Sequence, residues 1–337
     1  MSLKEALYST INGTKLGRAV LETRRVLRGD DAARAIAAST YEFDNRGTGS
    51  DRLCFVLAGY KPALWDDVFG RLAAYVPADV DVCILTSGLV SAQLRSLAEK
   101  NGWSYLATSV NHIGYVQNLV IELFPCAQWL YKLDEDIFLT RGYFERLLDT
   151  YRNIEENSPY LPAFVSPLIN VNCYGSLRIL ERVGLIDNFR EMGLAEAKLT
   201  DGVHHNLAMV REPEVARYLW GDTQHVLSDI DALSARFAAD GAGYSICPVR
   251  YSIGAILFTR ASWEEFEHFP LTCMGDAHGL GDDEEHICHY ACFGGRVMAI
   301  DEEIVVGHLG YGGAQTKAML SYHEEHPERF SLKQSGR

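Results

Sequence analysis

The stretch Trp129–Thr140, WLYKLDEDIFLT, joins an apolar segment to three consecutive carboxylates. Adjacent carboxylates repel one another and resist burial, so they form either a solvated turn or a site for a cation. In extended chain, residues i and i+2 point to the same side, which places Asp134 and Asp136 on one side and Glu135 on the other. Two carboxylates that converge at a strand end suit a hard divalent cation, because such ions prefer oxygen ligands.

The segments that precede this stretch predict a parallel sheet. Near-continuous apolar runs alternate with amphipathic segments, a pattern typical of βαβ units with helices on both faces of the sheet. The predicted strands are residues 52–60, 81–88, 103–110 and 129–136, and the predicted helices are residues 63–76, 91–102 and 114–125. Ligands of such sheets collect beyond the carboxyl ends of the strands, so the acidic triplet lies at the expected ligand edge.

The rest of the chain divides around a polar break, DNRGTGSD, at residues 44–51. Residues 4–43 have helical spacing, and we expect residues 1–50 to be an N-terminal helical appendage to one α/β domain over residues 51–335. Within that domain a helix is predicted at residues 142–157, and residues 176–245 are mostly helical. Residues 279–311 predict a loop, a helix, a strand, a turn and a strand.

Composition excludes several classes of protein. The chain has 337 residues with 31 Lys and Arg against 45 Asp and Glu, a formal charge of −14, which argues against nucleic acid as a partner. No stretch is long and apolar enough for a membrane span, and the first twenty residues lack the apolar core of a signal peptide. The eight cysteines include no CxxC pair, so we expect buried free thiols and a cytoplasmic protein.

Residues 52–140 resemble the nucleotide-sugar half of GT-A-fold glycosyltransferases. The stretch SVNHIGYVQN, residues 109–118, is similar to the asparagine–glycine–asparagine helix entry that many of these enzymes carry before their DxD strand, here Asn111, Gly114 and Asn118. Gln117 stands where many relatives have arginine. The resemblance implies a GT-A, Rossmann-like and mostly parallel sheet covered by helices, with a donor half at residues 51–140 and an acceptor half at residues 141–335.

The same resemblance implies roles for the acidic triplet and for the neighbouring strand ends. Asp136 would bind Mn²⁺ or Mg²⁺, Asp134 would contact the metal or the ribose, and Glu135 would contact the donor if it faces the sugar. A divalent ion neutralises the charge that develops on a leaving diphosphate. Besides Asn111 and Asn118, the donor pocket would be lined by Ala58, Gly59, Tyr60, Thr86 and Ser87.

A second acidic cluster, GLGDDEEHICHY at residues 279–290, opens a predicted helix. Acids at a helix N-terminus are favourable by the helix dipole alone, so capping is one interpretation. This stretch resembles the acidic helix start of inverting GT-A enzymes. The resemblance implies that Asp283 is the catalytic base and that Asp282 orients acceptor or sugar. His308 follows a short apolar strand, and the resemblance implies that it completes the metal sphere.

The predicted function is transfer of a sugar from a nucleotide sugar, more specifically a UDP-sugar, to a hydroxyl of a glycan or other acceptor. Inversion follows if Asp283 is a base, and a retaining transferase remains if Asp283 is only a cap. A sugar-phosphate nucleotidyltransferase ranks lower, because LAGYKPALW after the first strand offers only one lysine and one glycine. Trp263, Asn170 and Asn172 are further candidates for sugar contacts. The donor sugar, the acceptor and the oligomeric state are not specified by the pattern.

Overall fold

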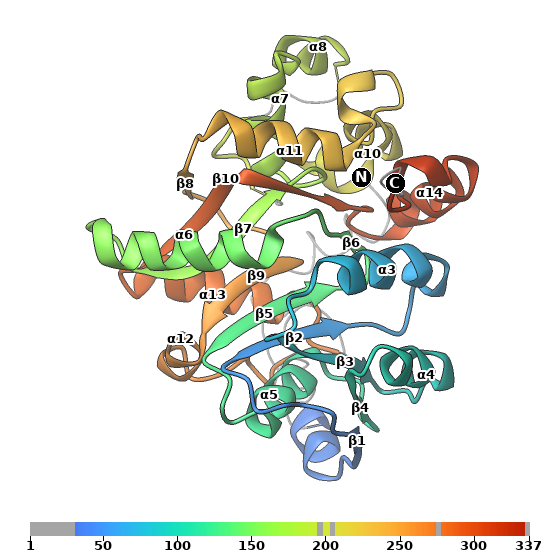
Figure 1. Ribbon diagram of the computed structural model, residues 1–337, viewed down its shortest axis with the longest axis vertical. Coiled ribbons are helices and arrows are strands. Elements are labelled where there is room, and N and C mark those ends of the chain that lie inside the picture. The colour runs from blue at the N-terminus through green and yellow to red at the C-terminus, as the bar shows by residue number, and fades with distance from the viewer. Residues whose placement is uncertain (1–30, 194–197, 203–205, 274–277, 334–337) are drawn as a thin grey trace, which may run out of the picture.

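The computed structural model describes residues 31–193, 198–202, 206–273 and 278–333. Its centre is one ten-stranded sheet with the order β1-β4-β3-β2-β5-β9-β7-β10-β6, and β8 pairs with β10. Figure 1 shows this sheet running from β1 at the bottom of the view to β7 and β10 above, with helices on both sides. The α/β class is therefore confirmed for the described residues.

The first half of the sheet follows the predicted alternation of strands and helices. Its four parallel strands pair in the order β4-β3-β2-β5, and α4 and α5 cover opposite faces of β3 and β4 (Figure 1). The elements are β2 (Arg52–Leu57), α3 (Trp65–Tyr75), β3 (Asp81–Ser87), α4 (Ala92–Lys100), β4 (Ser104–Thr108), α5 (Ile113–Leu123) and β5 (Trp129–Asp134). Local chemistry sets the helix starts: the Ser91 hydroxyl accepts from the Leu94 amide, and His112 does the same for Tyr115.

The second half of the sheet is mixed, so the expectation of a mostly parallel sheet is wrong there. Strand β9 (Ala255–Thr259) runs antiparallel to both β5 and β7 (Pro162–Ile169), and β10 (Val297–His308) is parallel to β7. Two short strands, β6 (Ile137–Phe138) and β8 (Tyr244–Cys247), pair antiparallel with β10. A strand buried on both faces is a continuous apolar run in either direction, so its sequence does not encode its orientation.

Strand β10 also replaces the predicted strand, turn and strand. Its polar centre, Asp301 to Glu303, forms a bulge instead of a turn, because the pairing with β7 shifts register between Asp301 and Val305. Around this half lie α6 (Tyr143–Asn157), α7 (Gly175–Val183), α8 (Ile186–Glu191), α9 (Leu207–Arg211), α10 (Pro213–Leu219), α11 (Ile230–Asp240), α12 (Arg260–Glu265), α13 (Asp282–Phe293) and α14 (Gly313–Glu325). The mostly helical character expected for residues 176–245 is thus confirmed over its described part.

The sequence predicted a wholly helical N-terminal segment, but its described part contains both a helix and a strand. Residues 31–37 are helical, but β1 (Tyr41–Asp44) joins the sheet antiparallel to β4. The following turn is attached by Asp81, which accepts hydrogen bonds from the amides of Thr48, Gly49 and Ser50. Residues 41–50 therefore belong to the edge of the sheet, whereas residues 1–30 of the expected appendage lie outside the described residues.

The cysteines and the helix lengths bear on two further expectations. Cys126 and Cys292 are exposed free thiols, so the expected burial is wrong for these two, whereas the other cysteines are buried. Of the helices in the described part of the chain, none has both the length and the apolar character needed to cross a membrane.

Candidate active site

The acidic triplet lies at the carboxyl end of β5, beside the end of β2, where Leu57 pairs with Asp134. The side chain of Asp134 is 35% exposed, whereas that of Asp136 is 2% exposed. β5 ends at Asp134, and Glu135 and Asp136 lie in the turn that follows, where Glu135 has partners different from those of the two aspartates. Asp134 and Asp136 thus remain at the ligand edge of the sheet, whereas the Glu135 carboxylate bonds a neighbouring loop.

Glu135 organises the loop between β2 and α3. Its carboxylate accepts hydrogen bonds from the backbone amides of Gly59 and Tyr60, each at 2.9 Å, and from the Trp65 indole at 2.7 Å. Both oxygens are therefore occupied by the protein itself, and the residue is buried. The expectation that Glu135 contacts the donor is replaced by a structural role in holding this loop.

Asp134 has a basic partner within its own strand. The Lys132 ammonium lies 2.7 Å from Asp134 Oδ1, and only 3% of the Lys132 side chain is exposed. Burial raises the pKa of Asp134, and the Lys132 ammonium opposes that shift without cancelling it. Residues i and i+2 share one face of a strand, so the sequence already placed this lysine on the side of Asp134.

Asp136 has two basic neighbours from distant parts of the chain. The Lys61 ammonium lies 2.6 Å from Asp136 Oδ2, and His308 Nε2 lies 3.6 Å from the same oxygen. Burial would raise the pKa of the Asp136 carboxyl, but Lys61 and His308 hold it well below its usual range. Asp136 is therefore an ionised carboxylate in a site that water hardly reaches.

His308 ends β10 and is held in a defined orientation. Its Nδ1 lies 2.9 Å from the Val171 carbonyl, and its amide donates to the Asn170 side chain at 2.8 Å. A carbonyl only accepts, so Nδ1 carries the proton and Nε2 faces Asp136. Burial lowers the pKa of His308, but Asp136 outweighs it and the net shift is upward. Figure 1 shows the strand that delivers His308 passing close to β7.

The asparagines proposed for sugar contacts are used in the protein frame. Besides the amide of His308, Asn170 bonds the Leu219 carbonyl through its Nδ2 atom. Asn172 accepts from the amides of Tyr174 and Gly175 at the start of α7. Both residues therefore position the loop beneath His308, and the expectation that they bind sugar hydroxyls is wrong for the oxygens that these bonds occupy.

The predicted donor pocket is brought together only in part. The Tyr60 side chain is 60% exposed, and its hydroxyl donates to the Ser87 carbonyl at 2.8 Å, which fixes the ring over the end of β3. Ser87 Oγ accepts from the His112 amide, and Asn111 is half-buried beside it. Gly88 has φ +74°, and a Cβ there would lie 2.4 Å from Asn111 Cβ, so a glycine is required where these loops meet.

Three other residues of that predicted pocket lie inside the protein. Ala58 is buried, and the Thr86 hydroxyl contacts the Tyr105 hydroxyl at 2.9 Å with no exposed surface. Asn118 bonds both the amide and the carbonyl of Phe269, and it also accepts from the Trp263 indole. Thr86 and Asn118 thus have partners within the protein, and their predicted contacts with the donor remain predictions. Trp263 is buried by the same contact.

The second acidic cluster opens α13, as predicted. Asp283 Oδ2 accepts from Gln117 Nε2 at 2.9 Å, and its Oδ1 accepts from the Glu284 amide. Asp282 accepts from the Thr272 hydroxyl at 2.9 Å, and both aspartates are buried. Glu284 is paired with Arg250 at 2.6 Å. Gln117, the position that departs from the arginine of many relatives, therefore serves to hold Asp283.

Lys132 joins the two acidic clusters electrostatically. Burial lowers the pKa of Lys132, but Asp134 on β5 and Asp283 on α13 outweigh it, so the net shift is upward. Asp283 also acts on Asp134 and adds to the upward shift of its pKa. Carboxylates from a strand end and a helix start, about 150 residues apart in the chain, thus both act electrostatically on one buried ammonium.

A divalent cation fits this donor set in one specific way. Within the described ranges, no three His, Cys, Asp or Glu side chains are grouped closely enough to hold a metal ion by themselves. Asp136 and His308 do converge, and the Lys61 ammonium stands in for a cation between the loop and the carboxylate. Mg²⁺ is commonly bound by only one or two protein ligands, while phosphate oxygens and water fill the other coordination positions. Asp134, predicted as a ligand, is instead paired with Lys132.

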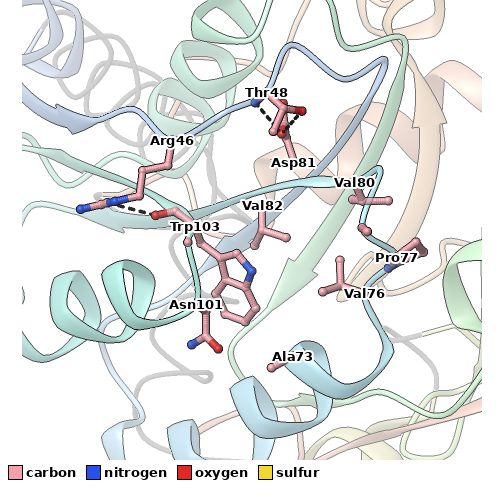
Figure 2. A pocket seen from close by; sticks show the side chains of 12 residues that line it. Arg46, Thr48, Ala73, Val76, Pro77, Val80, Asp81, Val82, Asn101 and Trp103 are labelled. Carbon is pink, nitrogen blue, oxygen red and sulfur yellow. Dashed lines mark hydrogen bonds between the residues drawn. The ribbon is translucent and has the colours of Figure 1, made fainter.

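A cavity of about 270 Å³ lies away from this site, at the amino ends of β3 and β4. Figure 2 shows that Arg46 bonds the Trp103 carbonyl and that Thr48 bonds Asp81 along its walls. These polar groups are satisfied by the protein, and the edge is opposite to the one where ligands of parallel sheets bind. We assign this cavity no chemical role.

Comparisons with known proteins identify no family. No protein-family model matches the chain, and no curated protein matches it. Among solved structures, the chain is similar to the mannosyltransferase PcManGT from Pyrobaculum calidifontis in complex with GDP-Man and Mn²⁺. The two share 10% identity over 91% of this chain and 68% of that chain, with a TM-score of 0.42. A likeness of this level carries no functional argument, so function is inferred from the side chains themselves.

Proposed function

We propose that this protein is a GT-A-type glycosyltransferase that transfers a sugar from a nucleotide sugar to a hydroxyl of a glycan or other acceptor. The observation that carries the proposal is the placement of two acidic clusters around Lys132. Asp134 and Asp136 end a strand at the ligand edge of the sheet, and Asp283 begins a helix that faces the same ammonium. A transferase needs one group to hold the diphosphate and a second to activate the acceptor.

The first cluster would hold the donor diphosphate. Asp136 and His308 would bind Mn²⁺ or Mg²⁺ together with phosphate oxygens of the donor. When bound, that ion supplies positive charge to the departing diphosphate. Tyr60, Ser87 and Asn111 lie on the adjacent strand ends and would receive the nucleoside, proposed to be uridine. Lys132 keeps Asp134 ionised and oriented toward the ribose or the phosphates.

The second cluster would activate the acceptor. Asp283 is buried and receives one hydrogen bond from Gln117 and one from the Glu284 amide, so its position is fixed by two elements. As a base it would take the proton of the attacking hydroxyl while the sugar–phosphate bond breaks on the opposite side, which inverts the anomeric centre. Asp282, held by Thr272, would orient the acceptor. We propose residues 51–140 as the donor half and residues 141–335 as the acceptor half.

A binding panel tests the donor assignment. Melting temperature and calorimetric binding are measured with UDP, GDP and CMP, each with Mn²⁺ and with EDTA. We expect UDP to bind in Mn²⁺ at least tenfold more tightly than in EDTA, because one divalent contact to a diphosphate is worth more than about 1.4 kcal/mol. If none of the three nucleotides binds in Mn²⁺, the proposed function is wrong.

A matched pair of variants tests the base. Asp283→Asn keeps the shape of the side chain but cannot accept a proton, so transfer should fall about 10²–10⁴-fold with UDP affinity unchanged. Glu285→Gln alters an acid in the same helix turn whose side chain is 69% exposed, and it should retain activity. Normal transfer by Asp283→Asn would exclude Asp283 as the base. Pyrophosphate release from a nucleoside triphosphate and a sugar phosphate would instead indicate a nucleotidyltransferase.

A further inference from the structure

We infer that Lys61 is the resident counter-ion of Asp136, that Lys61 gives up this carboxylate when a divalent cation binds, and that its freed ammonium then contacts the donor diphosphate. The inference rests on the proposed function for its last step only. Lys61, on the loop between β2 and α3, would exchange Asp136 for the diphosphate and so couple cation binding to donor binding.

The first support is the asymmetry of the Lys61–Asp136 pair. The two groups are 2.6 Å apart, but the Asp136 side chain is 2% exposed and the Lys61 side chain is 28% exposed. A carboxylate buried this deeply needs a positive partner at all times, because an unpaired buried charge is strongly unfavourable. The lysine, in contrast, reaches solvent and can exchange Asp136 for another anion.

The second support is the rigidity of the backbone that carries Lys61. Glu135 bonds the amides of Gly59 and Tyr60, the two residues that precede Lys61, and the Tyr60 hydroxyl bonds the Ser87 carbonyl. The lysine is followed by Pro62 at the start of a short 3₁₀ helix. The loop therefore stays in place, and rotation of one long side chain is enough for the exchange.

The third support is the contrast with Lys132. Its side chain is 3% exposed within β5, and its ammonium lies 2.7 Å from Asp134. Because almost none of the Lys132 side chain reaches solvent, it cannot turn to an outside anion as Lys61 can, and it remains the partner of Asp134. The chain thus supplies each aspartate of the pair with its own ammonium, one fixed and one able to leave.

The fourth support is the charge of the site. The carboxylates Asp134, Asp136, Asp283 and Glu284 are matched by four basic groups, Lys61, Lys132, Arg250 and His308, so the site has no surplus of positive charge. A diphosphate brings further negative charge and needs such a surplus. A divalent ion that takes the place of Lys61 on Asp136 supplies it and releases one ammonium for the phosphates.

The test measures two affinities that the inference moves in opposite directions. Mn²⁺ alone is titrated into the full chain, with the free ion followed by electron paramagnetic resonance. UDP is then titrated calorimetrically at saturating Mn²⁺. For Lys61→Met we expect Mn²⁺ to bind about tenfold more tightly, because its competitor is gone, and UDP to bind about tenfold more weakly, because a charged contact to phosphate is lost.

Two further variants control for folding and position. Lys61→Arg keeps the positive charge and should restore both affinities toward those of the wild type, which a merely damaged loop would not do. Lys100→Met removes an exposed lysine from the end of α4 and should change neither affinity. Unchanged or weaker Mn²⁺ binding by Lys61→Met overturns the inference, and unchanged UDP binding overturns its last step.

The outcome also separates this inference from the proposed function. If Lys61→Met binds Mn²⁺ more tightly while no nucleotide binds the wild type in Mn²⁺, Lys61 is the counter-ion and the transferase proposal is wrong. If UDP binds the wild type in Mn²⁺ while Lys61→Met leaves Mn²⁺ affinity unchanged, the function stands and the exchange of partners is wrong.

Discussion

The two edges of the parallel sheet each bury an aspartate, but they satisfy it in different ways. At the amino edge, Asp81 accepts from the amides of Thr48, Gly49 and Ser50 and from the Thr48 hydroxyl. At the carboxyl edge, Asp136 has two basic side chains as partners and, among the described residues, no such ring of backbone donors. Fixed dipoles cannot leave, whereas a lysine can, so the first arrangement suits a structural carboxylate and the second suits a ligand site.

The largest effect should come from breaking the carboxyl edge. Asp136→Asn removes the ionised ligand of the proposed cation, and we expect transfer to fall at least about 100-fold. Its unfolding free energy should also fall, because the depressed pKa of Asp136 means that the fold favours the ionised carboxylate, and the buried His308 loses its partner. Transfer assays and urea unfolding measure the two quantities. Full activity in Asp136→Asn would show that Asp136 is not part of a ligand site.

The amino edge should respond in the opposite manner. Asp81→Ala leaves four hydrogen-bond donors without their acceptor, and we expect the unfolding free energy to fall by about 3 kcal/mol. UDP affinity in Mn²⁺ should not change, because Asp81 lies at the far end of β3 from Ser87. Asp79→Ala, with a side chain that is 68% exposed, is the matched control in urea unfolding. A loss of UDP binding with intact stability would contradict the comparison.

A third buried aspartate sharpens the contrast, because it has neither a paired cation nor a full set of donors among the described residues. Asp301 in the β10 bulge accepts one hydrogen bond from the Thr150 hydroxyl and one from the Glu303 amide. Burial raises the pKa of Asp301 to about 6. The folded protein therefore holds this proton more tightly than the unfolded chain, and the resulting stability is lost as pH rises from about 4 to about 6.

Asp301→Asn should remove this pH dependence. At pH 7.5 the variant avoids a buried ionised carboxylate, and we expect it to be more stable than the wild type by about 2 kcal/mol. Near pH 4 the difference should become small, because Asp301 is then protonated in the folded state and about half protonated in the unfolded chain. Urea unfolding at the two pH values provides the measurement. Equal stabilities of variant and wild type at pH 7.5 would show that Asp301 is not strained by ionisation.

The sequence predicted the position of the ligand edge better than the contacts within it. The sequence separates Glu135 from Asp134 and Asp136 by the two-residue period of a strand, and the three residues do have different partners, although Glu135 and Asp136 lie in a turn; the βαβ series places all three at a carboxyl end. Both inferences depend on local geometry alone. The pairings of Lys61 and Asn118 do not depend on local geometry, because Asp136 lies 75 residues from Lys61 and Phe269 lies 151 residues from Asn118. Tertiary packing brings such residues together, and a single sequence does not give the distances between them.

The smallest effect should come from Glu135→Gln. Glu135 is held by backbone amides, as Asp81 is, but it lies next to Asp136 in the chain. An amide keeps one oxygen acceptor but loses the other, so part of the set of donors from Gly59, Tyr60 and Trp65 is left unpaired. We expect about 1 kcal/mol less stability and a KM for the donor a few-fold higher, because this loop carries Lys61. The turnover number should stay near that of the wild type. The ranking by activity would then be Asp136 before Glu135. A Glu135→Gln variant that loses turnover as completely as Asp136→Asn would show that Glu135 acts on the donor and not through the loop.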